Sequence, residues 1–299
     1  MAPTDAPRVH QPVIVLGAPR SGTTLLASIL SAHSQVRVIG EPRLVWRYGN
    51  DGRSDQLRAE HATPRVIDHI HRNFATALAD GHGTKLVEKT PANALRPRFV
   101  DAVFPDARYV HITRDGWGAV PSMRTFWERR AGGVDAKQAT KLRRRLREAR
   151  LSQVPFYVGE VAARLFPRSA PGRRTPLYGP RLAGLQAMAD ELGRLETSAM
   201  QWRACVEAAA SFGRSLPADR YLEVKLESLD RWVMATIVEF CGLAPEEAVA
   251  ARFDECYRID AASRQAPLTD GERDLVAPWV TAANQWLGYD AHPAGTAGT

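Results

Sequence analysis

The segment over residues 13–26 constrains the fold more than any other part of this chain. Its four apolar residues VIVL lead into the turn GAPRSG, and the apolar-periodic sequence TTLLASIL follows at once. This order predicts a buried β-strand, a phosphate-binding loop and an α-helix. The spacing from Gly17 to Gly22, with Thr23 and Thr24 next, matches the frame of a nucleotide P-loop. Thr23 stands where an NTPase carries its lysine, so the loop predicts phosphate binding and argues against ATP hydrolysis.

The residue types of this loop favour an anionic ligand. The start of a helix leaves backbone N–H groups without partners, and the helix dipole adds positive potential there. Gly22 lets the backbone approach closely, and the hydroxyl groups of Ser21, Thr23 and Thr24 add donors. Arg20 contributes a permanent cation whose planar guanidinium suits phosphate or sulfate oxygens. A glycine turn can be only a tight connection, but the flanking strand and helix favour a phosphate site.

Strand-like and helix-like segments alternate along the rest of the chain. We expect strands over residues 13–16, 36–39, 85–88, 108–113 and 221–226. We expect helices over residues 24–33, 66–78, 94–104, 117–127, 191–212, 232–241 and 270–286. Alternation of this kind indicates βαβ units. The predicted fold class is therefore α/β: a three-layer, P-loop NTPase-like fold with a mostly parallel central sheet flanked by helices.

The 299 residues are interpreted as a single domain with an insertion. The α/β core is expected over residues 12–129 and 190–290. Residues 130–190 break the alternation with five prolines, several glycines and a basic run at 137–150. That run carries seven Lys or Arg residues against one acid. It is interpreted either as a solvated helix face or as part of an inserted lid that recognises an acidic or polar acceptor.

Composition limits the possible partners without choosing one. The net charge of +7 and the isoelectric point near 9.6 favour an anionic ligand, whether nucleotide, nucleic acid or acidic lipid. Aromatic residues do not interleave the basic run, which disfavours nucleic-acid binding. The tails at 1–11 and 291–299 are rich in Pro, Ala, Gly and Thr, and are predicted to be flexible.

Cysteine usage and apolar runs indicate where the protein resides. The three cysteines are odd in number and not spaced as a motif, so we expect reduced core residues: Cys205, Cys241 and Cys256. No secretory signal is visible, and no apolar run approaches the ~20 residues of a membrane span. We therefore expect a cytoplasmic protein with no integral membrane segment.

A second candidate phosphate element follows the strand predicted at 108–113. Ligands gather beyond the carboxyl ends of the strands in a parallel sheet, and Arg114 stands at such an end. Ser122 lies eight residues later, about two turns into the next helix. The two side chains could grip a second phosphate. Alternatively, Arg114 could pair with Asp115 or cap a helix.

Together the two elements resemble those of the sulfotransferases that use 3′-phosphoadenosine 5′-phosphosulfate (PAPS). The sequence PRSGTT resembles their 5′-phosphosulfate loop, and Arg114 with Ser122 resembles their 3′-phosphate motif. The likeness is to bacterial and tyrosylprotein sulfotransferases, which share PRSGTTL and RDG. It covers residues 12–125 well and is loose after residue 190. It implies a single sulfotransferase domain that binds PAPS, releases PAP and needs no metal. The implied nucleotide-binding residues are Arg20, Ser21, Gly22, Thr23, Thr24, Leu25, Arg114 and Ser122.

The resemblance also implies catalytic residues. Sulfuryl transfer to a hydroxyl needs a base for the proton and cations for the developing charge. Glu41 matches the glutamate base of the tyrosylprotein enzymes, and Lys89 matches the family lysine that contacts the bridging oxygen. Arg20 would share the work of Lys89 and takes the place of the missing NTPase lysine. Simple ion pairs with Arg43 and Glu88 are the alternative roles of Glu41 and Lys89.

Histidine is the other candidate base. Many cytosolic sulfotransferases use the histidine of a KTH motif, but this chain has KTP in its place. His33 and His111 are the remaining candidates, and the apolar strand around His111 favours a core position for it.

The acceptor site is expected to involve the insertion. Within it the resemblance persists only at YGPR, so Tyr178 and Arg181 join Arg43 as candidate acceptor-binding residues. We expect a hydroxylated small molecule as acceptor, such as a glycolipid, a sugar or a secondary metabolite, and a homodimer is possible. One alternative is a P-loop small-molecule kinase that uses Mg-ATP, with Asp115 as its magnesium ligand. Another is a non-catalytic basic protein that binds nucleic acid through residues 137–150.

Overall fold

Five parallel strands form one central sheet in the computed structural model, which describes residues 7–131, 153, 157, 178–257 and 268–290. The strand order is β2-β3-β1-β4-β5. The strands are β1 (Val13–Leu16), β2 (Val36–Gly40), β3 (Lys85–Lys89), β4 (Arg108–Thr113) and β5 (Tyr221–Lys225). The predicted α/β class with a parallel sheet is confirmed, and each predicted strand lies within one residue of its observed end.

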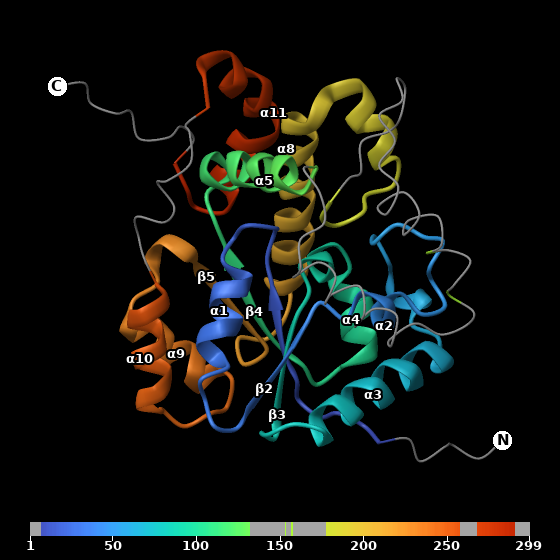
Figure 1. Cartoon of the computed structure of the whole chain (residues 1–299), viewed down its shortest axis with the longest axis vertical. Helices are drawn as coiled ribbons and strands as arrows, with labels where there is room; N and C mark the ends of the chain where they lie inside the picture. Colours follow the sequence, from blue (N-terminus) through green and yellow to red (C-terminus); the bar gives the residue numbers. More distant parts are fainter. Residues whose placement is uncertain (1–6, 132–152, 154–156, 158–177, 258–267, 291–299) are drawn as a thin grey trace.

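Helices cover both faces of the sheet, as Figure 1 shows. On one side lie α1 (Thr23–Leu30), α9 (Arg231–Phe240) and α10 (Glu247–Cys256). On the other side lie α2 (Arg43–Arg47), α3 (Pro64–Ala79), α4 (Pro97–Val103) and α8 (Leu185–Gly213). Two further helices, α5 (Gly116–Ala131) and α11 (Asp270–Trp286), lie at the top of the view and join the second core.

The side chains of β1 alternate between the two faces of the sheet, and this alternation explains the three layers. Val13 and Val15 belong to the core under α1 and α9, whereas Ile14 and Leu16 belong to the core under α4 and α8. Successive side chains of a strand point to opposite faces, so a strand that is apolar at every position must be covered twice. All four residues are completely buried, as a central parallel strand requires.

Two helix predictions were wrong in detail because of proline and glycine. The helix predicted over 94–104 is a 3₁₀ segment (Pro91–Leu95) followed by α4. Pro97 starts α4 at its first position and disfavours helical geometry at Arg96, whose φ is −135°. The helix predicted over 191–212 begins earlier and is kinked at Gly193, where φ is 76°.

Short or weakly patterned helices were missed altogether. Neither α2 nor α10 was predicted from the sequence, and the 3₁₀ segments Ala59–His61 and Leu226–Ser228 were missed as well. Such elements depend on tertiary packing more than on periodicity.

Most of the predicted insertion at 130–190, its basic run at 137–150 and the tails at 1–6 and 291–299 lie outside the described residues. The division into core halves and insertion stays a prediction.

Candidate active site

The loop between β1 and α1 opens the site at the carboxyl end of the sheet. Gly22 caps α1 with a φ of 89°, a left-handed conformation that favours glycine. A Cβ atom there would lie 2.7 Å from Leu226 Cδ1. The first hydrogen bond of the helix joins Leu26 N to Gly22 O at 2.9 Å. The N–H groups before Leu26 therefore have no intrahelical partner, and with the helix dipole they form an anion site.

The hydroxyl-bearing side chains of the loop point in different directions. Ser21 is fully buried, and its Oγ has no hydrogen-bond partner among the described residues. Thr23 is 3% exposed, and a Cβ atom at Gly17 would lie 2.7 Å from its Cγ2. Thr23 therefore fills the space beside the loop. Thr24 is exposed and faces the site, and Leu25 packs partly into the core.

Arg20 connects the phosphate loop to Arg114 and Ser122, the second candidate phosphate element. Its Nε donates to Ser122 Oγ at 3.0 Å, and its carbonyl oxygen accepts from Arg114 Nη1 at 3.0 Å. The guanidinium of Arg20 also lies 5.6 Å from the centre of the Phe126 ring. Arg114 and Ser122 are 6% and 1% exposed. Burial lowers the pKa of Arg114, while Glu227 and other nearby groups raise it, and a guanidinium keeps its charge at neutral pH.

Lys89 and Glu41 form an ion pair on the same edge of the sheet. Lys89 Nζ donates to Glu41 Oε1 at 2.8 Å and to Thr24 Oγ1 at 3.1 Å. The ammonium is almost buried, whereas a third of the Glu41 side chain is exposed. Candidate base, candidate cation and phosphate loop are thus in direct contact. The alternative pairing of Lys89 with Glu88 is not observed, because neighbouring strand residues point to opposite faces.

Two candidate residues have strained backbones. The φ angles of Arg20 and Glu41 are 69° and 55°, and Gln11 is the one other described non-glycine residue with positive φ. Such a conformation costs of the order of 1–3 kcal/mol and persists where the surroundings fix it. Strain of this kind clusters at active sites and ligand clamps. The positive φ fixes the direction in which the side chains of Arg20 and Glu41 leave the backbone.

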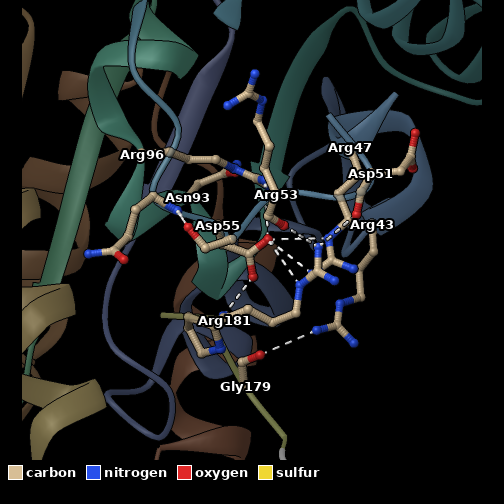
Figure 2. A network of polar contacts seen from close by, with 12 residues as sticks. Arg43, Arg47, Asp51, Arg53, Asp55, Asn93, Arg96, Gly179 and Arg181 are labelled. Carbon is tan, nitrogen blue, oxygen red and sulfur yellow. Dashed lines mark hydrogen bonds and ion pairs between the residues drawn. The ribbon is translucent and has the colours of Figure 1, made fainter. Parts of the chain in front are cut away.

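The candidate acceptor residues lie beside this centre. Arg43 Nη2 donates to Gly179 O at 3.3 Å, which brings the half-buried Tyr178 next to α2. Arg181 Nη2 donates to the carbonyl oxygen of Arg53 at 2.9 Å (Figure 2).

A buried carboxyl lies under the site on the other face of β3. Glu88 is completely buried and accepts hydrogen bonds from Trp46 Nε1 at 3.0 Å, Thr90 Oγ1 at 2.5 Å and Asn93 Nδ2 at 2.8 Å. Burial raises the pKa of Glu88 to about 7, although the hydrogen bonds from Thr90 and Trp46 and the nearby cations oppose the shift. Sequence reasoning missed Asn93, because nothing in its sequence context distinguishes it.

Neither candidate histidine reaches the site. His33 is 2% exposed, and its carbonyl oxygen accepts from Val36 N at the start of β2, at the amino end of the strands. His111 is completely buried within β4, where Nδ1 lies 2.7 Å from Tyr221 Oη. Its expected core position is confirmed.

Asp115 has a structural role. Its Oδ1 accepts from Trp117 N at 3.0 Å, at the start of α5, and from Asn284 Nδ2 at 2.6 Å. Among the described residues, no cluster of His, Cys, Asp or Glu side chains is arranged to hold a metal ion.

Comparison with known proteins shows which family the first part of the chain is similar to. The model of the sulfotransferase family matches residues 12–157. This range contains the phosphate loop, Glu41, Lys89 and the Arg114–Ser122 element. The predicted resemblance to the sulfotransferases is confirmed over these residues.

Curated relatives match little more than a third of the chain. A putative protein-tyrosine sulfotransferase of Caenorhabditis briggsae is 33% identical over 122 residues, 38% of this chain and 43% of that protein. Protein-tyrosine sulfotransferase 2 of Gallus gallus is 30% identical over 125 residues, 38% of this chain and 33% of that protein. The chain therefore spans less than half the length of these curated relatives.

Solved structures share the fold over nearly the whole chain. The sulfotransferase domain of the Synechococcus PCC 7002 olefin synthase has a TM-score of 0.50 and 17% identity, covering 97% of this chain and 98% of that chain. A sulfotransferase from Alicyclobacillus acidocaldarius has a TM-score of 0.51 and 12% identity, covering 94% and 97%. No helix in the described part of this chain has both the length and the apolar character to cross a bilayer.

Proposed function

We propose that this protein transfers the sulfuryl group of PAPS to a hydroxyl group of an acceptor. One observation carries the proposal: the Lys89–Glu41 ion pair touches the phosphate loop through Thr24, at hydrogen-bond distances of 2.8 and 3.1 Å. The candidate base and the candidate cation would thus lie where the phosphate loop would hold a donor. The family of residues 12–157 agrees with this chemistry.

The residues of the loop fit the two anionic ends of PAPS. Gly22, at a φ of 89°, exposes the N–H groups at the start of α1 to the 5′-phosphosulfate. Arg114 and Ser122 are joined through Arg20 and would hold the 3′-phosphate. The guanidinium groups of Arg20 and Arg114 and the hydroxyl group of Ser122 thus lie around one loop. This arrangement suits a ligand with charge at both ends. The side chain of Thr23 is buried, so position 23 offers no group that could contact a γ-phosphate as the NTPase lysine does.

The chain's own residues can then perform the transfer. PAPS supplies the sulfuryl group, and the phosphate to which that group is bonded is the leaving group. Glu41 would accept the proton of the acceptor hydroxyl as its oxygen forms a bond to sulfur. Lys89 would donate to the phosphate oxygen as the sulfur–oxygen bond to it breaks, which yields PAP and the sulfated acceptor. An ammonium has three donors, so Lys89 can contact that oxygen while it still binds Glu41 and Thr24.

The acceptor is proposed to be a hydroxylated small molecule. Its pocket would be bounded by Arg43 and by the residues around Tyr178, which meet through the Arg43–Gly179 hydrogen bond. The curated relatives are named for protein tyrosine, so a tyrosine peptide is the main competing acceptor. Both acceptors present a hydroxyl to Glu41.

Two measurements test the proposal. Calorimetry should detect PAP binding and little binding of Mg-ATP. Incubation with ³⁵S-labelled PAPS and, in separate reactions, 4-nitrophenol, a sugar or a tyrosine peptide should then yield a labelled product from at least one. Tight Mg-ATP binding with magnesium-dependent turnover, and no response to PAP, would refute the proposal in favour of a kinase.

A further inference from the structure

Asp55 is the centre of a buried polar network in the loop that follows α2. It is 1% exposed, and its Oδ1 accepts from Arg47 Nε and Nη2, both at 3.2 Å. The same oxygen lies 3.6 Å from Arg96 Nη1. Arg47 and Arg96 are 5% and 1% exposed. Figure 2 shows how their side chains converge on the Asp55 carboxylate. Asp55 is therefore the counterion of two buried cations.

The network continues to the strand end that carries Lys89. Arg96 Nε donates to Asn93 Oδ1 at 2.9 Å, and Asn93 Nδ2 donates to Glu88 Oε2 at 2.8 Å. Glu88 immediately precedes Lys89 in β3. A continuous chain of polar contacts thus connects Asp55 to β3 directly below the candidate site.

Asp55 also binds a segment far away in the sequence. Its Oδ2 accepts from Arg181 N at 2.7 Å, and its own N–H donates to Arg181 O at 2.7 Å. Beside this pair, Gln56 Oε1 accepts from Ala183 N at 2.9 Å. Residues 178–183, called here the 178–183 segment, are therefore joined to the loop after α2 through their backbone.

A buried glutamine also holds this segment. Gln201 is completely buried in α8, and its Nε2 donates to Tyr178 O at 3.2 Å and to Pro180 O at 2.8 Å. Two carbonyl groups of the segment are fixed by this one side chain. Asp55 and Gln201 thus define the path of the backbone between them.

This path passes beside the phosphate loop and the candidate base. A Cβ atom at Gly179, whose φ is 93°, would lie 3.8 Å from Pro19 Cγ. Gly179 O accepts from Arg43 Nη2 at 3.3 Å, and Arg43 N donates to Glu41 O at 2.8 Å. The segment is therefore in contact both with the loop that would hold the donor and with the turn that carries Glu41.

We propose that Asp55 is a positioning residue for the acceptor side of the active site. It acts through Arg181 by holding the 178–183 segment against the phosphate loop and α2, so that the segment forms a fixed wall of the acceptor pocket. The proposal rests on the proposed function. It concerns acceptor binding alone, because Asp55 touches none of the residues assigned to the nucleotide.

The first experiment tests the anchoring without any substrate. Amide hydrogen exchange is measured on the full chain for the wild type, Asp55→Ala, Gln201→Leu and the control Asp101→Asn. Asp101 pairs with Arg220 at 2.7 Å, a partly buried pair away from the 178–183 segment. We expect exchange of the 178–183 amides to rise at least tenfold in the first two variants. Exchange in the control should stay at the wild-type level.

The second experiment tests the function of the anchoring. PAP affinity and transfer kinetics are measured for the same variants, with whichever of 4-nitrophenol, a sugar or a tyrosine peptide the wild type sulfates fastest. We expect the acceptor KM to rise at least fivefold, kcat to change less, and PAP affinity to stay within twofold. Asp55→Glu, which retains the carboxylate, should recover part of the lost acceptor affinity.

The outcomes separate the two proposals. If Asp55→Ala does not fold because Arg47 and Arg96 lose their counterion, Gln201→Leu tests the same segment with the counterion in place. Folded variants with unchanged exchange at 178–183, or with unchanged acceptor KM, would overturn the role of Asp55. Failure of the wild type to sulfate any acceptor would overturn the proposed function and this role with it, while the exchange data would still show whether Asp55 holds the segment.

Discussion

Glu41 and Lys89 are joined twice, once through their side chains and once through their backbones. Lys89 Nζ donates to Glu41 Oε1 at 2.8 Å, and Glu41 N donates to Lys89 O at 2.9 Å. The two residues lie at the ends of neighbouring strands, where Gly40 is the register partner of Lys89. Sheet pairing therefore sets the distance between the candidate base and the candidate cation.

Replacement of the candidate base should remove turnover and leave nucleotide binding. Glu41→Gln keeps the size of the side chain and an oxygen that can accept from Lys89, but it cannot take a proton. We expect kcat to fall roughly 10²–10⁴-fold with PAP affinity unchanged. The measurement is labelled sulfuryl transfer beside PAP calorimetry, with Glu60→Gln, at a 65% exposed side chain, as control. Turnover at the wild-type level in Glu41→Gln would refute the base assignment.

Replacement of the candidate cation should affect the same step. Lys89→Met preserves most of the buried aliphatic volume at a side chain that is 7% exposed, but it removes the donor for the leaving oxygen. We expect a large loss of kcat. The double variant with Glu41→Gln should lose much less than the product of the two single effects, because the two residues are in contact. Multiplicative losses would indicate that they act independently.

The Arg114–Ser122 element should be specific for the 3′-phosphate. Removal of a charge-assisted hydrogen bond costs about 1.5–3 kcal/mol, so Arg114→Ala should weaken PAP binding roughly 10–100-fold. The matched ligand is adenosine 5′-phosphosulfate, which lacks the 3′-phosphate and should bind the variant and the wild type alike. Equal losses of affinity for the two ligands would instead show that Arg114 has a general role in the loop.

The NTPase lysine should not be tolerated at position 23. Thr23 is 3% exposed and packs against Gly17, so Thr23→Lys would bury an ammonium group without a partner. We expect a lower thermal midpoint and no ATP hydrolysis. Thr76→Lys is the control, because Thr76 is exposed within α3 and should accept the longer side chain with little loss of stability. An equally stable Thr23→Lys protein would contradict the observed packing.

Glu88 should make stability depend on pH. Its pKa is about 7 in the folded chain and near 4.5 in the unfolded chain. The folded state therefore binds more protons between these values, and the free energy of unfolding falls as pH rises through them. The contribution is about 3 kcal/mol, from about 1.4 kcal/mol per pKa unit. Between pH 5 and pH 8, urea unfolding should show a smaller decrease in the free energy of unfolding for Glu88→Gln than for the wild type. Equal decreases in the two proteins would contradict the assignment.

Much of the site could be predicted from the sequence because its residues lie at strand ends. The phosphate loop, Glu41 and Arg114 each follow a strand, and Lys89 is the last residue of one. In a parallel sheet these carboxyl ends share one edge. Local pattern and strand direction are therefore sufficient to place these residues together. The Arg20–Ser122 contact was not predicted, because it depends on how α5 packs.

The contacts around Asp55 were decided by the tertiary structure alone. Asp55 and Arg181 are 126 residues apart, and no periodicity or motif connects them. Asp55 is buried only because Arg47 and Arg96 surround it, and a buried carboxylate requires such partners. The sequence by itself determined the sheet edge and the chemistry gathered there. The packing of distant segments determined which surfaces enclose that chemistry, since burial and charge pairing are properties of the folded chain.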